Sequence, residues 1–342
     1  MLIFTLRRLN LFIFTLIVLT ALSFSLSFLF PGDALINMTG QINATPEQRI
    51  MLIEEYQYNG NVFQQYWAYL THLFNGDLGV SISTHLPISS EIMSLLPATI
   101  ELSVVALFIA MVIGIPLGFI AAVSHKKFTD NTILFISMLG YSIPIFWLGL
   151  LAILIFSIEL GWLPSAGRLS LVYEIEPITG IQFFDILMSK SEYKWQAFQD
   201  ATLHIIMPAC VIAIAPMTTF IRLARTSMME VLESSYIKAA KAKGLTFWQI
   251  IHRHAIRNAL VNVIRYVGLR FANLVTLAMV TEVIFSWPGI GRWLIESIFQ
   301  RDYTAIQGGL LALSSFIFLV HILTDFIYAA LNPLAREHKH GS

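Results

Sequence analysis

The sequence predicts an all-α integral membrane protein with six transmembrane helices, and three observations lead to this fold class. The 342 residues are 56% hydrophobic and only 12% charged, whereas soluble domains carry about 25% charged residues. Five runs lack Asp, Glu, Lys and Arg for 21 to 28 residues, which is enough to cross a hydrocarbon core of roughly 30 Å. A sixth segment is apolar except for one Arg and one Glu near its ends. Lipid is therefore the main solvent of this chain.

The expected spans follow one another in a single membrane domain, and no internal repeat of about 20 to 50 residues is visible in the sequence. The five uncharged runs are 9–32, 102–124, 131–158, 201–221 and 303–324, and the additional segment, 266–285, is span five in chain order. The first run follows Arg7 and Arg8, as in a signal peptide, but it is long for a signal sequence and no A-x-A cleavage pattern follows it. We therefore expect a retained helix.

The distribution of charge predicts the orientation. With six spans, the termini and the second and fourth loops share one side and carry 14 Lys and Arg, against 6 on the other side. The basic side is cytoplasmic by the positive-inside rule, so both termini are expected in the cytoplasm. The 21 basic and 21 acidic side chains cancel, which gives no global field for nucleic acid. Cys210 is the only cysteine, and this excludes an intrachain disulfide and a C-x-x-C pair.

The outer loops are expected to carry some structure of their own. Thr45 and Gln48 form a predicted capping box with Pro46 at the first helical position, so a helix is expected over 46–56. It belongs to a periplasmic subdomain, 33–97, between the first two spans. The expected order is 1–32 for the N-terminal segment and first helix, 33–97 for the subdomain, 98–335 for the main transmembrane domain and 336–342 for the tail. Pro and Gly interrupt the long loop 161–200, whose short pieces have no predicted position.

A basic, alanine-rich segment, 236–260, lies in the cytoplasmic loop between spans four and five. Ser235 is a suitable N-cap for a short helix. One face of this helix carries residues at i, i+3, i+4 and i+7: Tyr236, Ala239, Ala240 and Lys243.

Two signals end this helix and start another. Gly244 stands where a helix ends in the left-handed conformation. Thr246 and Gln249 then form a capping box, with Leu245 and Ile250 as its hydrophobic staple. The pattern predicts a helix, a glycine corner and a second helix.

The first of these helices is interpreted as a docking surface, because small side chains let another backbone come close. Its exposed face is expected to be Ala239 and Ala240, flanked by Lys238, Lys241 and Lys243. One alternative is a solvated basic loop that obeys the positive-inside rule. Another is a basic amphipathic helix on anionic lipid, for which the apolar side is thin.

The loop resembles the EAA motif of bacterial ABC importer permeases, in which two alanines precede a glycine and a short helix fits a groove on the ATPase. Lys238 stands where the motif name expects Glu, and basic residues there are usual in the peptide-permease branch. The segment RHAIRNAL, 253–260, is also similar to that branch, with Val261 in place of a common proline. The resemblance implies coupling to an ATPase by Tyr236, Lys238, Ala239, Ala240, Lys243, Gly244 and His254.

The resemblance to dipeptide and oligopeptide permease subunits covers nearly the whole chain. The matching phrases, in order, are FTLRRL (4–9), GDLGVS (76–81), PATIELSV (97–104), SIPIFWLGLL (142–151), GWLPSAGR (161–168) and SWPGIGRWL (286–294). Two phrases, YEIEPITG (173–180) and TLAMVTEVIFSWPGIGRWL (276–294), look most like the Sap branch, named for sensitivity to antimicrobial peptides.

The resemblance implies a non-catalytic permease subunit of the bacterial inner membrane that forms half of a translocation pathway. Its implied partners are a second homologous permease, two cytosolic ABC ATPases, a periplasmic substrate-binding protein and the lipid bilayer, without nucleic acid. ATP and Mg are expected in the ATPases and no cofactor or metal in this chain, which has no GxxxxGK[ST] loop. The implied cargo is a peptide, including antimicrobial or cationic peptides. Putrescine or another polyamine and haem are alternatives, and the direction of transport stays open.

Three residues are candidates for the pathway or its gate. Pro144 in span three is expected to kink the helix, either as a hinge or for packing alone. Arg270 lies about one turn inside the cytoplasmic end of span five, where snorkelling favours an anchoring role. Glu282 is expected near the outer mouth, about 18 Å from Arg270 along the helix, with a role in gating or helix packing; an acid there would also suit a cationic cargo.

Two other classes of protein are alternatives for a chain of this composition. An intramembrane enzyme would cluster acids or histidines at one membrane face, whereas here they are scattered. An ion-coupled secondary transporter would carry buried carboxylates near the midplane, often with inverted repeats. Co-purification separates the classes, because only a permease of this kind brings down an ATPase pair.

Overall fold

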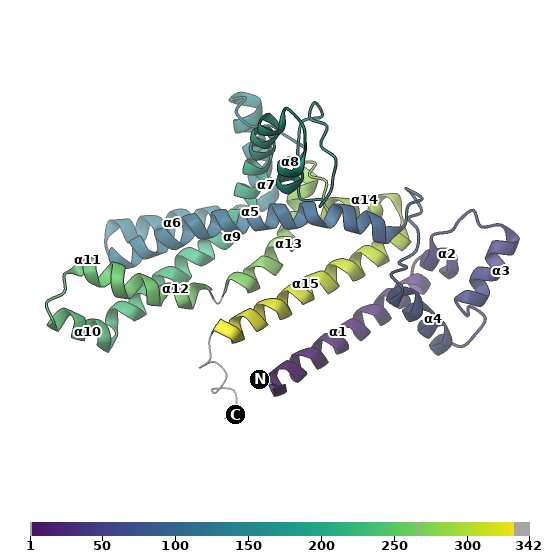
Figure 1. The fold of residues 1–342 in the computed structure, drawn as a ribbon, viewed down its shortest axis with the longest axis horizontal. Coiled ribbons are helices and arrows are strands. Elements are labelled where there is room, and N and C mark those ends of the chain that lie inside the picture. The colour runs from purple at the N-terminus through teal and green to yellow at the C-terminus, as the bar shows by residue number, and fades with distance from the viewer. Residues whose placement is uncertain (1, 265, 332–342) are drawn as a thin grey trace. The chain divides into compact units, whose positions relative to one another are not determined.

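The structure is a computed structural model that describes residues 2–264 and 266–331, so the predicted tail 336–342 lies outside the described residues. Within these ranges the chain consists of helices and loops with one isolated antiparallel bridge, Val80 to Pro87. It divides into two compact units, Met1–Ala98 with Pro288–Ser342 and Thr99–Trp287. The long helix α5 (Ile88–Val123) contributes residues to both units (Figure 1).

The expected count of six spans is not confirmed. Among the described residues, four helices are long and apolar enough to cross a membrane: Leu9–Leu29 in α1 (Leu2–Leu29), α5, α9 (Lys194–Glu233) and Tyr303–Thr324 in α15 (Tyr303–Leu331). A fifth is obtained if α6 (Phe128–Ser142) and the helix from Ile145 to Glu159, which bend by 96° at their junction, count as one span. The remaining predicted span, 266–285, corresponds to the helix α13 (Val267–Ile284), whose fully described part, Asn273–Ile284, is a shorter apolar helix.

The first unit is built on α1 and α15, which pack against each other. Buried Ser27 on α1 donates a hydrogen bond of 2.8 Å to the Gln307 side chain on α15. The helices α2 (Ala34–Thr39) and α14 (Ile290–Gln300) pack on α15. The carboxylate of Asp302, between α14 and α15, is fully buried and accepts hydrogen bonds from Ser81 and Ser83 at 2.6 and 3.0 Å. Burial of this charge is therefore compensated by hydrogen bonds.

Two short helices follow α2 in the first unit. The predicted capping box is confirmed: Thr45 and Gln48 exchange bonds of 3.3 and 2.9 Å, and α3 (Pro46–Glu55) ends one residue earlier than expected. A second box, at Asn61, was not predicted and starts α4 (Val62–Phe74). Both helices pack on one apolar cluster: Phe24, Leu35, Met38, Tyr56 and Tyr69, with Leu52 and Tyr66 at its edge.

The second unit is organised around α9, a helix of 40 residues. The helices α6, α7 (Ile145–Ala152), α12 (Ile256–Ile264) and α13 all pack on it. The helix α5 approaches α9 closely at Gly114 and Gly118. A Cβ atom at Gly118 would lie 2.5 Å from the carbonyl oxygen of Ile221, and one at Gly114 would lie 2.9 Å from that of Met217. This is the small-xxx-small spacing that lets two membrane helices touch through their backbones.

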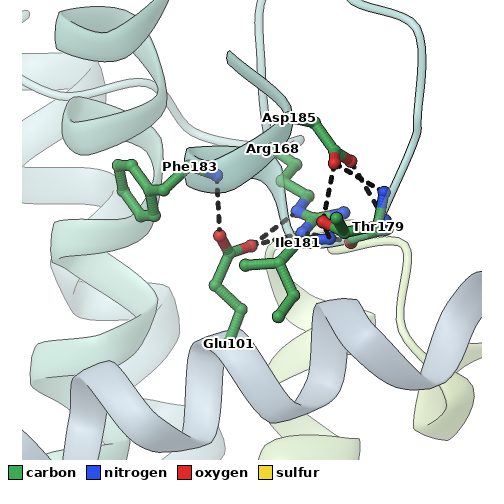
Figure 2. Close-up of polar contacts among 7 residues, drawn as sticks. Glu101, Arg168, Thr179, Ile181, Phe183 and Asp185 are labelled. Atoms are coloured by element: carbon green, nitrogen blue, oxygen red, sulfur yellow. Dashed lines mark hydrogen bonds and ion pairs between the residues drawn. The ribbon is translucent and has the colours of Figure 1, made fainter. Parts of the chain in front are cut away.

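The loop 161–200, whose short pieces had no predicted position, is fixed in place by hydrogen bonds to buried and half-buried carboxylates. Glu101 on α5 accepts hydrogen bonds from Arg168 Nε at 2.9 Å and from the Phe183 amide at 3.1 Å, and it also pairs with Arg168 Nη2 (Figure 2). Asp185 in α8 (Gln182–Met188) accepts bonds from the amide and hydroxyl groups of Thr179 at 2.7 and 2.6 Å.

A third carboxylate continues this arrangement at the start of α9. Asp200 accepts two bonds of 2.7 Å from the amide and hydroxyl groups of Ser170. The ring of buried His204 makes a hydrogen bond of 2.8 Å to the Asp200 carbonyl. The loop is thus fixed to both α5 and α9 by polar contacts, together with the packing of α8 on α9.

Replacing Gly118 by leucine should loosen the α5–α9 contact. The new side chain would meet the α9 backbone, and overpacking of this kind costs about 1–3 kcal/mol. We expect a lower temperature of unfolding for the Gly118→Leu chain in detergent, followed by size-exclusion chromatography after heating. Val112→Leu, at a 53% exposed position of the same helix, is the control and should behave like the unmodified chain. Equal thermal stability of the two variants would contradict the assigned packing.

Replacing Arg168 by methionine should destabilise the loop 161–200. The Glu101 and Arg168 side chains are 4% and 12% exposed, so the change leaves a buried carboxylate without its cation, which typically costs about 3–5 kcal/mol. We expect faster proteolysis within the loop and a lower temperature of unfolding. Adding Glu101→Gln should recover part of the loss, since the amide oxygen can still accept from Phe183. A double variant as unstable as the sum of both single variants would show that the pair does not act together.

Candidate coupling loop and pathway residues

The cytoplasmic loop of the sequence prediction begins where α9 ends. Ser234 is the residue before α10 (Ser235–Ala242), with extended φ −64° and ψ 154°, so the expected N-cap at Ser235 is wrong by one position. The Ser234 hydroxyl donates to the Val231 carbonyl at 2.5 Å and makes no capping bond. The chain therefore turns sharply from α9 into α10 through one extended residue.

The glycine corner is confirmed. Gly244 has φ +83°, in the left-handed region that glycine adopts at little cost. Its amide donates to the Lys241 carbonyl at 3.0 Å, and the Leu245 amide donates to the Ala240 carbonyl at 3.3 Å, which closes α10.

The second helix starts as predicted. Thr246 and Gln249 form a reciprocal capping box, with bonds of 2.9 and 3.4 Å, for α11 (Phe247–Ile250). The helix continues as the π-helical turn η2 (Ile251–Ala255) and then as α12. The expected staple is present, because Leu245 and Ile250 belong to one hydrophobic cluster.

This cluster divides α10 into two sides and corrects one prediction. Ile237 and Ala240 are 0% and 8% exposed and pack with Ile250, Ile251 and Met228 of α9. Ala240 was expected on the exposed face beside Ala239, and this is wrong. The inner face of α10 needs a small apolar residue to lie against α9 and η2, and Ala240 fills that position.

The outward side of the loop is basic, with small residues between the charges. Ala239 is exposed, and so are the lysines around it: Lys238, Lys241 and Lys243. Tyr236 is 43% exposed, and its hydroxyl accepts a hydrogen bond of 3.1 Å from Asn258 of α12. His254 is half-buried, and its carbonyl accepts from the same amide at 2.9 Å. The seven predicted coupling residues thus lie in one folded unit, although Ala240 belongs to its core.

Polar contacts that the sequence interpretation missed connect this loop to the membrane helices. Ser227 on α9 donates to the Ala259 carbonyl of α12 and accepts from the Asn262 side chain, both at 3.1 Å. Two residues before Ser227 on α9, Arg225 donates hydrogen bonds of 2.7 and 2.8 Å to the Asp130 carboxylate of α6. The available signal was a pair of opposite charges near two uncharged runs: Asp130 directly precedes the run 131–158, and Arg225 follows the run 201–221 by four residues.

At Pro144 the helix is interrupted, which is a larger disturbance than the expected kink. The helix α6 stops at Ser142 and α7 starts at Ile145, so the predicted third span is broken by a bend of 96°. The Pro144 carbonyl accepts from the amides of Trp147 and Leu148, so this proline begins a new helix rather than bending a continuous one. The helix that it begins packs on α13, which carries the other two candidates.

The two charged candidates on α13 differ in what the structure describes. Glu282 is fully buried, and its carboxylate accepts a hydrogen bond of 2.6 Å from Thr99 of α5. This contact agrees with a role in helix packing, and its role in gating stays a prediction. Arg270 is a residue of α13, and the structure describes its backbone but not its side chain.

The sequence matches two family models. Residues 114–337 match the binding-protein-dependent transport system inner membrane component, and residues 1–103 match the N-terminal part of the membrane component of such systems. The fold of solved chains agrees. The chain resembles the structure of the MetNI methionine ABC transporter in inward facing conformations, with a TM-score of 0.50 at 18% identity over 69% of this chain and 93% of that one.

Curated relatives cover nearly the full length. The chain is 40% identical over 99% of its length, and 100% of the relative's, to the di/tripeptide transport system permease protein DppB of Pseudomonas aeruginosa (strain UCBPP-PA14). It is 42% identical, over 99% and 98%, to the putrescine export system permease protein SapB of Escherichia coli (strain K12). The expected resemblance to peptide permeases and to the Sap branch is confirmed. The chain belongs to the family of binding-protein-dependent transport system inner membrane components.

Proposed function

We propose that this chain is the membrane-spanning permease subunit of an ATP-driven peptide transporter and forms half of its translocation pathway. The observation that carries the proposal is the similarity of about 40% identity along the whole chain to permeases named for dipeptide and peptide transport. Peptides with a cationic or antimicrobial character are included in this substrate class, because relatives of the Sap branch lie at the same level of identity.

The proposal includes partners that do the chemical work. A second related permease would complete the pathway, two cytosolic ATPases would bind ATP and Mg, and a periplasmic binding protein would deliver substrate. This chain would then be non-catalytic and multi-pass in the inner membrane, with both termini in the cytoplasm. The family description supports binding-protein dependence and the inner membrane. The 14 to 6 distribution of Lys and Arg supports the orientation.

The loop 235–260 would be the mechanical contact with the ATPases. Its support is geometric: α10 exposes Ala239 among three lysines, while Ile237 and Ala240 attach the same helix to α9 through a buried cluster. A force applied to the exposed side would therefore reach α9 directly, because packed side chains transmit displacement. Pro144, Arg270 and Glu282 would lie along the moving helices or the gate.

A second substrate class is favoured by one observation. The E. coli K12 relative at 42% identity is named for putrescine export, and its identity to this chain is close to that of the DppB protein at 40%. The transport experiment below therefore compares a dipeptide with putrescine, and it includes haem as a third candidate substrate.

Replacing Ala239 by aspartate should uncouple the ATPases while the complex still assembles. The change places a charge in a contact that requires close approach, and a loss of ~1.4 kcal/mol corresponds to about a tenfold effect. We expect substrate-stimulated ATP hydrolysis by the purified complex to fall about tenfold or more. Ala44→Asp, the same change in the segment before α3, is the matched control and should hydrolyse ATP normally. Normal stimulated hydrolysis by the Ala239→Asp complex would refute the assigned contact.

Transport by the reconstituted complex identifies the substrate class. In vesicles with the four subunits and the binding protein, we expect labelled dipeptide to be transported only with ATP and Mg, and unlabelled putrescine and haem serve as competitors. Transport of putrescine without competition by peptides would assign the polyamine instead. Transport by this chain alone, driven by an ion gradient and independent of ATP, would establish a secondary transporter and contradict the proposal.

A further inference from the structure

The short helix α4 lies against the membrane-spanning helix α1. Tyr66 and Tyr69 of α4 form hydroxyl–hydroxyl hydrogen bonds with Thr20 at 2.8 Å and Ser23 at 2.9 Å. Phe24 packs edge-on against Tyr66, with the ring centroids 5.5 Å apart. Figure 1 shows α4 beside the C-terminal part of α1. These contacts fix the height of α4 along α1.

That height falls within the apolar span. The 21 residues Leu9–Leu29 rise about 31 Å at 1.5 Å per residue, which matches a hydrocarbon core of roughly 30 Å. Thr20 and Ser23 precede Leu29 by nine and six residues, or about 13 and 9 Å along the helix axis, and a tilt of about 20° changes this little. Side chains reach only about 5–6 Å from a helix axis. Therefore α4 itself must lie at or below the boundary between headgroups and acyl chains.

The side of α4 that faces away from α1 is also apolar. Phe63, Trp67 and Phe74 are 84%, 71% and 87% exposed. Their spacing of i, i+4 and i+11 places them in one stripe along the helix. A helix that is apolar on both sides is not suited to bulk water. The neighbouring α3 differs, since its exposed residues include Glu47 and Arg49.

The surroundings of the stripe fit lipid. Leu22, Phe28 and Leu29 of α1, at the same height as α4, are 55%, 48% and 76% exposed, as expected for a lipid-facing span. A shallow hollow of about 340 Å³ beside Trp67 is bordered by the polar side chains of Gln57, Asn61 and Gln64. An aromatic stripe with a polar edge is the arrangement that interfacial helices use between acyl chains and headgroups.

We propose that α4 is an interfacial membrane helix whose Phe63–Trp67–Phe74 stripe contacts the acyl chains of the leaflet in which α1 ends. The segment between the first two membrane helices is then a part of the lipid-facing surface rather than a purely aqueous subdomain. Phospholipid is the partner of this face, and Tyr66 and Tyr69 hold α4 to α1 at the required depth.

Spin labels report this depth directly. Cys210→Ser gives a chain without cysteine, in which Phe63→Cys, Trp67→Cys and Phe74→Cys are labelled one at a time. Leu22→Cys on α1 is the lipid-facing control, and Glu47→Cys on α3 is the water-facing control. The full-length chain, with its co-expressed transporter partners, is measured in phosphatidylethanolamine–phosphatidylglycerol nanodiscs. Collisions with oxygen, which concentrates in lipid, are compared with collisions with a water-soluble nickel complex.

The proposal expects all three α4 labels to resemble Leu22, with an oxygen-to-nickel collision ratio several-fold above that of Glu47. Ratios equal to that of Glu47 would overturn it, because the stripe would then face water. Low collision rates with both reagents would also overturn it, since another protein chain would then cover the stripe. Moving the label to Thr71, at the edge of the stripe, should give an intermediate ratio.

Discussion

The close approach of α5 to α9 is the constraint on which the second unit depends. Gly118 brings the α5 backbone to where a Cβ atom would lie 2.5 Å from an α9 carbonyl, so no other residue fits without separating the helices. The 40 residues of α9 extend about 60 Å as a helix. Asp200 near one end holds the loop 161–200, and Ser227 near the other end holds α12. The single helix α9 thus contacts the loop 161–200 near its start and α12 near its end.

The proposed coupling to partner ATPases would act through the cytoplasmic loop of the sequence prediction, 235–260. The helix α10 is attached through Ile237 and Ala240 and exposes Ala239 with its lysines. The corner at Gly244 is closed by hydrogen bonds and Thr246 caps the next helix, so the two short helices of the loop are held to each other. The Asp130–Arg225 pair extends the attachment to α6. Coupling would then act on several helices together.

Sequence patterns predicted the features that depend on neighbouring residues. The capping boxes at Thr45 and Thr246 and the left-handed Gly244 each involve residues within five positions, and all three are present. Patterns failed where distant segments meet. Ala240 is buried because Ile250 and Met228 lie over it, and Glu101 meets Arg168 across 67 positions. Likewise, a proline inside an apolar run predicts a disturbed helix, but the 96° bend at Pro144 depends on the packing of α7 against α9 and α13.

The central claim is that Ala239 lies in the contact with an ATP-driven motor, and a photo-reactive amino acid at this position tests it most directly. Irradiation of cells that carry the substituted chain should give a covalent adduct with a nucleotide-hydrolysing subunit, identified by mass spectrometry, and its yield should change when the ATPases are trapped with nucleotide. Adducts with phospholipid alone, in cells in which the complex is assembled, would contradict the account.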